Sequence, residues 1–203
     1  MILSYSKRFM RRFRTIIFEL FRKRYNKGNT YYQVKPGEWV NLKRFMSLQL
    51  ESQVMKNLAK QFSYDSWECD YRVIQILRWV HSNITYTSDD QLWGIPEYWE
   101  DAETILKNHK SDCEGGAMLI VTLARLAGVP ADRIYLKTGW VNYNNKNVGH
   151  AYVSYLSDNG LEYYLDWCYF YDSRLIRSRP FAYEQTKYDA MWFMVNDKFN
   201  LVM

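Results

Sequence analysis

The chain has few cysteines, and they show no arrangement that would build a structural framework. Cys69, Cys113 and Cys168 are an odd number in 203 residues, and no two of them form a CxxC pair. No cysteine and histidine spacing typical of zinc ligands is present either. The sequence therefore predicts neither a disulfide framework nor a metal site. Reduced cysteines are typical of the cytoplasm, which we expect to be the compartment.

Other features that define whole classes of protein are also missing. The sequence has no run of roughly 18 apolar residues, so we expect no membrane-spanning helix. Charges interrupt the apolar positions near the N-terminus and no small-residue cleavage site follows, so we expect no secretory signal. Acidic loops of the calcium-binding kind are not evident, and the sequence predicts no cofactor.

Positive charge is concentrated at the N-terminal end of the chain. The net charge is +5, but residues 1–28 hold nine Lys or Arg against Glu19, and the remaining chain is slightly acidic. Apolar residues recur in this segment at helical spacing, namely Phe9, Phe13, Ile16, Ile17, Leu20 and Phe21. The pattern predicts a basic amphipathic helix over residues 5–26, within an N-terminal extension of residues 1–28.

Four roles of this extension are compatible with the pattern. The helix packs on its own domain with a solvated basic face, or it docks to a protein partner. It could equally lie on a membrane surface or contact nucleic acid. Residues 26–30 have linker composition, and residues 31–203 are expected to form the domain. The oligomeric state is left open.

The remaining chain mixes helical and strand patterns, which predicts an α+β fold. Apolar residues have helical spacing over residues 42–62, 70–83 and 117–126, and they alternate over residues 134–141, 148–156 and 161–170. Asn159 and Gly160 form a hairpin signal between the last two strands. Residues 191–203 are typical of a closing strand or hairpin.

Cys113 stands where a loop turns into the most apolar helix of the chain. That helix is expected to end at Gly128 and Pro130. Unpaired N–H groups and the positive end of the helix dipole favour a thiolate at such a position. A thiolate is the reactive form of cysteine, so Cys113 is a candidate nucleophile. A free cysteine is also commonly a small buried hydrophobe, and this alternative stays open.

His150 and Asp166 follow on two successive strand patterns. A hairpin between those strands would bring the two side chains together. Cysteine, histidine and aspartate are a nucleophile, a base and an orienting group. Cys168 is expected on the same face as Asp166, as a buried neighbour of the site rather than a second nucleophile.

Five short blocks occur in a fixed order at 99–106 (WEDAETIL), 111–114 (SDCE), 126–130 (LAGVP), 149–152 (GHAY) and 165–166 (LD). Together they resemble the transglutaminase-like superfamily, and its bacterial cysteine peptidases most of all. The resemblance covers about residues 93–170. It implies a papain-like fold, in which a nucleophile helix packs on an antiparallel sheet, with a Cys113–His150–Asp166 triad.

The resemblance also implies that Trp99 stands near the oxyanion site. Gln91 is a further candidate, because papain-like enzymes use an upstream glutamine amide as an oxyanion donor, and Trp93 is another. The alternative for all three is a place in a groove wall or the core. The chain departs from the family at Ser111, where glycine is usual. Glycine often permits a backbone that other residues resist, so the loop could differ here.

Two functions follow as hypotheses. The first is a hydrolase or acyl transferase that acts on amide bonds of a peptide or protein substrate, that is, a thiol protease or amidase. The second is a transglutaminase-like binding module with little or no turnover, for example a phage virion or assembly component docked by residues 1–28. In that case the chain would belong to a viral particle.

Overall fold

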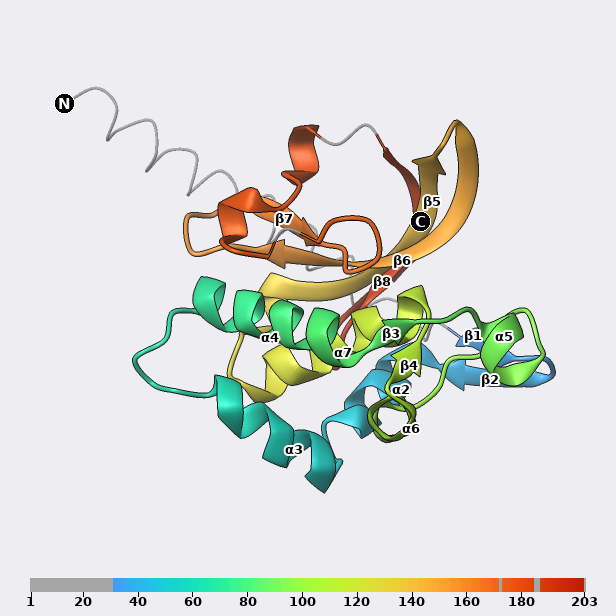
Figure 1. Cartoon of the computed structure of the whole chain (residues 1–203), viewed down its shortest axis with the longest axis horizontal. Coiled ribbons are helices and arrows are strands. Elements are labelled where there is room, and N and C mark those ends of the chain that lie inside the picture. The colour runs from blue at the N-terminus through green and yellow to red at the C-terminus, as the bar shows by residue number, and fades with distance from the viewer. Residues whose placement is uncertain (1–30, 172, 185–186, 203) are drawn as a thin grey trace.

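The computed structural model describes residues 31–171, 173–184 and 187–202. The basic helix predicted within residues 1–28 lies outside the described residues. In the described part, the helices lie on one side of an antiparallel sheet (Figure 1). This is the α+β architecture that the sequence predicted. Among the described residues, no helix combines the length and the apolar character needed to cross a membrane.

The helices occupy the segments that have helical spacing. They are α2 (Leu42–Gln49), α3 (Gln53–Ala59), α4 (Cys69–Asn83), α5 (Asp89–Trp93), α6 (Ala102–Asn108) and α7 (Cys113–Leu126). The single pattern over residues 42–62 is divided between α2 and α3. Ser52 causes the break, because its side chain accepts a hydrogen bond from the Met55 N–H and caps α3.

Helix α7 is the central helix of the fold. Every residue from Glu114 to Ala124 is buried, as expected for a helix that is apolar all round. It contacts α3, α4 and α6 on one side and strands β5 and β6 on the other. Gly128 follows its end with φ of 90°, a left-handed conformation that glycine adopts without strain, as the sequence predicted.

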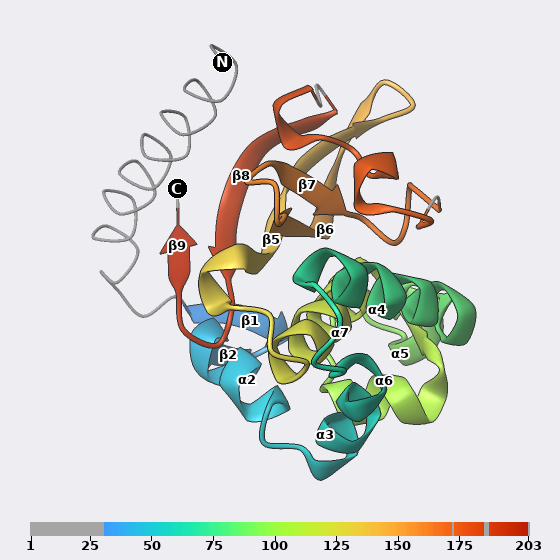
Figure 2. The same ribbon diagram turned by 90° about the vertical axis from the view of Figure 1, so that its left-hand side faces the viewer.

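The main sheet has five antiparallel strands in the order β7-β6-β5-β8-β9. Its strands are β5 (Ile134–Tyr143), β6 (Lys146–Leu156), β7 (Glu162–Leu165), β8 (Tyr188–Val195) and β9 (Asn200–Val202). Figure 2 shows β8 and β9 at the edge of the sheet that is farther from α4. Two further sheets of two strands each are a hairpin of β1 (Tyr31–Lys35) and β2 (Glu38–Asn41) and a short parallel pair of β3 (Thr85–Tyr86) and β4 (Lys110–Ser111).

Strand β7 is shorter than the predicted strand over residues 161–170, and its early end shapes the site. Its last residue, Leu165, pairs with Val153 of β6. The chain then turns, because Oδ1 of Asp166 accepts hydrogen bonds from the N–H groups of Cys168 (2.8 Å) and Tyr169 (3.2 Å). A short aspartate side chain commonly draws the following backbone into such a turn. The edge of β6 beyond Val153 is thereby left open to another element.

Candidate active site

Cys113 lies at the part of the β6 edge that β7 leaves unpaired. It is the first residue of α7, and the N–H of Ala151 in β6 donates a hydrogen bond to its Sγ at 3.4 Å. A strand N–H that would otherwise pair with β7 thus points at the sulfur. The early end of β7 brings the N-terminus of α7 beside the residue that follows His150.

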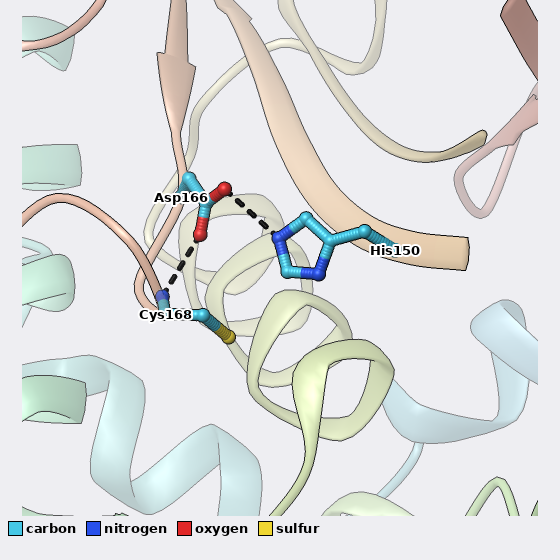
Figure 3. Close-up of side chains that lie close together, drawn as sticks. All are labelled: His150, Asp166 and Cys168. Carbon is cyan, nitrogen blue, oxygen red and sulfur yellow. Dashed lines mark hydrogen bonds and ion pairs between the residues drawn. The ribbon is translucent and has the colours of Figure 1, made fainter. Parts of the chain in front are cut away.

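His150 of β6 and Asp166, which directly follows β7, form a buried pair. Figure 3 shows the two side chains facing each other. Nε2 of His150 lies 2.9 Å from Oδ2 of Asp166, and the two side chains are 3% and 0% exposed. A carboxylate accepts hydrogen bonds, so this contact places the imidazole proton on Nε2. Nδ1, the other ring nitrogen, points away from Asp166 and is left to act as a base (Figure 3). The prediction that these side chains lie close together is confirmed, although Asp166 lies just after the paired strand rather than on it.

The carboxylate of Asp166 accepts four hydrogen bonds from the described residues. The hydroxyl of Tyr188 in β8 donates to Oδ2 at 2.6 Å, beside His150, and the two turn N–H groups donate to Oδ1. Burial by itself would raise the pKa of Asp166, but the hydrogen bonds from His150, Tyr188 and Cys168 outweigh it and hold the pKa below its usual range. Asp166 is therefore a charged and rigidly oriented acceptor. Sequence reasoning missed Tyr188, which lies 22 residues away with no local signal.

Cys168 lies where the sequence placed it, as a neighbour of the pair. One ligand atom from each of His150, Asp166 and Cys168 lies within 4.8 Å of the others. The ring of Tyr169 packs on the ring of His150 with 4.6 Å between centroids. The turn after β7 therefore surrounds the imidazole with a carboxylate, a thiol and an aromatic ring.

The three predicted oxyanion residues make other contacts in this structure. Trp99 is buried and its indole N–H donates to Oε1 of Glu97 at 2.8 Å. The indole N–H of Trp93 donates to Oε2 of Glu100 at 3.1 Å, and Gln91 is exposed in α5. These indole bonds do not reach Cys113, so the oxyanion roles of Trp99, Trp93 and Gln91 remain predictions.

Acidic side chains surround the sulfur and oppose the effect expected from the helix dipole. Burial raises the pKa of the Cys113 thiol well above its usual value, and the charges of Glu114 and Asp112 raise it further. The thiol donates a hydrogen bond to Oε2 of Glu114 at 3.2 Å. The expectation that the helix N-terminus alone favours a thiolate is therefore wrong for this arrangement.

The acidic residues form one group beside Cys113, in which Asp89 and Glu114 are buried and Glu97 and Asp112 are half-buried. Ligand oxygens of Asp89, Glu97 and Glu114 lie within 4.8 Å of one another, and Asp112 and Glu114 are equally close to Cys113. Burial raises the pKa of Asp112 to about 7, and it raises the pKa of Glu114 well above the usual range. The sequence shows Asp112 and Glu114 beside Cys113, but only the fold adds Asp89 and Glu97 to them.

This donor set fits a hard divalent cation. One buried oxygen on each of Asp89, Asp112 and Glu114 has no hydrogen-bond partner among the described residues. Several carboxylate oxygens without donors are the ligands that calcium prefers. The sequence predicted no metal site, because residues from two separate segments supply the donors.

Ser111 is accommodated without the backbone that glycine would permit. It lies in β4, and it is not among the described residues with positive φ. Gly115 makes room for it, because a Cβ added at Gly115 would overlap Oγ of Ser111. The glycine missing at residue 111 is thus matched by a glycine four residues later, in the first turn of α7.

Comparison with known proteins finds solved structures of similar fold. The structure is similar to EGTA-treated Legionella pneumophila LapG, with 15% identity, a TM-score of 0.56, and coverage of 80% of this chain and 86% of that chain. Calcium-bound Legionella pneumophila LapG gives 14% identity, a TM-score of 0.55, and coverage of 80% and 88%. At such low sequence identity, the structural similarity shows a shared fold alone. A search of curated proteins found no match.

A helix that begins with cysteine and packs on an antiparallel sheet defines a papain-like fold. The family model described as "Transglutaminase-like superfamily" matches residues 56–171, which is more than half of the chain. The chain belongs to the transglutaminase-like superfamily.

Proposed function

We propose that the protein is a cysteine peptidase or amidase in which Cys113 is the nucleophile, His150 the base and Asp166 the orienting group. The observation that carries this proposal is the buried 2.9 Å bond between Nε2 of His150 and Oδ2 of Asp166. It fixes the tautomer that leaves Nδ1 free as a base. The N–H of the next residue, Ala151, reaches the sulfur.

The proposed reaction passes through an acyl-enzyme. His150 removes the proton of Cys113, and the sulfur attacks the carbonyl carbon of an amide. The imidazolium then returns the proton to the leaving amine as the C–N bond breaks. Water, deprotonated by His150, attacks the thioester and releases the acid and the free thiol. Asp166 stays ionised throughout and stabilises the imidazolium. An amine in place of water would give transfer instead of hydrolysis.

We further propose that calcium binds beside Cys113. The support is the close group of Asp89, Glu97, Asp112 and Glu114, together with the calcium-bound form of the similar LapG. These four residues would hold the ion through carboxylate oxygens. A bound cation would supply positive charge that offsets the carboxylates next to the sulfur.

The alternative is a binding module of the same fold with little turnover, docked through residues 1–28. One observation favours it, namely the burial and acidic surroundings that hold the Cys113 thiol protonated. Calcium separates the two proposals. A peptidase gains activity when the carboxylates are neutralised, whereas a binding module gains stability alone.

The test is hydrolysis of a library of peptide amides, with and without millimolar calcium and under a phosphine reductant, read by mass spectrometry. We expect cleavage by the unmodified chain and by Cys69→Ser, whose cysteine lies in α4. Cys113→Ser and His150→Ala should each lose at least about a hundredfold in rate. Cleavage that persists in Cys113→Ser, or a folded chain that cleaves no member under either condition, would overturn the peptidase proposal.

A further inference from the structure

Cys168 is a thiol that the proposed reaction does not use, although it lies against residues that the reaction does use. Figure 3 shows its sulfur on the same side of the turn as the His150–Asp166 pair. Nitrogen, oxygen and sulfur ligand atoms from the three residues all lie within 4.8 Å of one another. His150 and Asp166 are buried and Cys168 is half-buried, so solvent covers little of this group.

We propose that His150, Asp166 and Cys168 form a binding site for Zn²⁺. Zinc is bound in proteins by thiolate, imidazole and carboxylate, with bonds of about 2.0 to 2.3 Å and four ligands in all. Three of these ligands are in place, and water takes the fourth position. The ligand atoms around a zinc ion lie somewhat closer together than 4.8 Å. The side chains of His150, Asp166 and Cys168 therefore have to rotate slightly to bring these atoms together, while the backbone stays in place.

The hydrogen bonds of Asp166 are compatible with such an ion. Zinc would take the place of the imidazole N–H at Oδ2: Nε2 of His150 would bind the ion and its proton would move to Nδ1. The Tyr188 hydroxyl would remain a donor to Oδ2 at 2.6 Å. The N–H groups of Cys168 and Tyr169 would still hold Oδ1. Outer contacts of this kind orient the ligands of metal sites and strengthen binding. The thiol of Cys168 would lose its proton to solvent as the sulfur binds the ion.

The site differs in chemistry from the acidic group beside Cys113. Asp89, Glu97 and Glu114 supply only carboxylate oxygens, which suit calcium. Sulfur and imidazole nitrogen select zinc and cobalt over calcium and magnesium. The two sites should therefore bind different ions from a mixture. If the proposed function holds, zinc also withdraws His150 from Cys113 and inhibits the enzyme, whereas the binding itself does not rest on that function.

The experiment uses Co²⁺ as the probe on the full chain, under a phosphine reductant. We expect a thiolate-to-cobalt charge-transfer band in the near ultraviolet, removed by one equivalent of Zn²⁺ and unchanged by millimolar Ca²⁺. Cys168→Ser should lose the band and weaken cobalt binding at least tenfold. Cys69→Ser, the matched control in α4, should retain both the band and the affinity.

Two further variants identify the ligands. His150→Ala should also lose affinity, and it tests the site independently if Cys168→Ser fails to fold. Cys113→Ser should keep the band. The proposal is overturned if the folded unmodified chain shows no band. It is equally overturned if Cys168→Ser keeps the band, or if Cys113→Ser removes it, since the thiolate would then be the nucleophile. All these readouts are made without substrate, so they do not depend on whether the chain is a peptidase.

Discussion

Replacing Asp166 by asparagine should reverse the tautomer of His150. Asparagine keeps the shape of the side chain but turns one acceptor oxygen into a donor NH₂ group. Oδ1 receives two backbone N–H groups at 2.8 and 3.2 Å, so the amide oxygen of Asp166→Asn must take that side. The NH₂ group then faces Nε2 of His150. Nε2 has to accept a hydrogen bond, and the proton moves to Nδ1, which can no longer act as a base.

The two backbone N–H donors to Oδ1 determine how rarely His150 keeps its original tautomer in Asp166→Asn. Turning the amide the other way restores the tautomer but leaves two buried N–H groups unpaired, at about 1–3 kcal/mol each. The competent orientation is therefore populated in roughly one molecule in 30 to one in 10⁴. We expect alkylation of Cys113 by iodoacetamide near neutral pH to slow by the same factor. Nitrogen-15 NMR of the imidazole should show the proton on Nε2 in the unmodified chain and on Nδ1 in Asp166→Asn.

The matched control is Asp101→Asn. Asp101 caps α6 by accepting from the Thr104 N–H, and asparagine caps a helix about as well as aspartate. This variant should alkylate at the original rate. A folded Asp166→Asn protein that alkylates at the original rate, with the proton still on Nε2, would refute the reasoning.

Three further predictions concern stability, measured by urea unfolding. Tyr188→Phe removes the hydroxyl at 2.6 Å from Asp166 and should cost about 1.5–3 kcal/mol at pH 7. Because Asp166 has a lowered pKa, the stability it contributes is lost as the pH falls from the pKa of the unfolded chain to that of the folded chain. Tyr188→Phe raises the folded pKa, so the loss should be smaller and should end at a higher pH. Gly116→Ala places a methyl group against the Trp167 ring and should cost about 1–3 kcal/mol. Asp112 has its pKa raised from 3.8 to about 7, so the free energy of unfolding should fall as pH rises between these values, by at most about 1.4 kcal/mol per unit.

Each of these has a result that would contradict it. An unchanged free energy of unfolding in Tyr188→Phe would contradict the first prediction and would mean that water replaces the hydroxyl. Gly116→Ala would keep its stability if the indole could move aside. An Asp112→Asn variant should flatten the dependence on pH, and an unchanged slope would mean that another group carries it.

The elements and the meeting of His150 with Asp166 were predictable because local patterns encode them. The apolar run after Cys113 and the stop at Gly128 define α7, and the turn at Asn159 and Gly160 pairs β6 with β7. That hairpin brings the end of β7 beside β6, and Asp166 then meets His150 from the first position after the strand. The family motifs named the same residues independently.

What the sequence could not predict depends on distant residues meeting in the fold. Tyr188 reaches Asp166 from β8, on the other side of β5 and β6. Asp89 and Glu97 meet Glu114 only because the segment between α4 and α6 folds back over the start of α7. The pKa of Cys113 follows from that group, so an argument from the helix dipole alone gave the wrong direction.

The measurement that tests the central claim most directly is the mass of the chain quenched in acid during turnover of a cleavable peptide ester. The account predicts one acyl group, attached to Cys113 as a thioester and absent from Cys113→Ser. It also predicts that the acyl group persists longer in His150→Ala, because no base activates water there. An acyl group on another residue, or product formed with no covalent species in either protein, would contradict it.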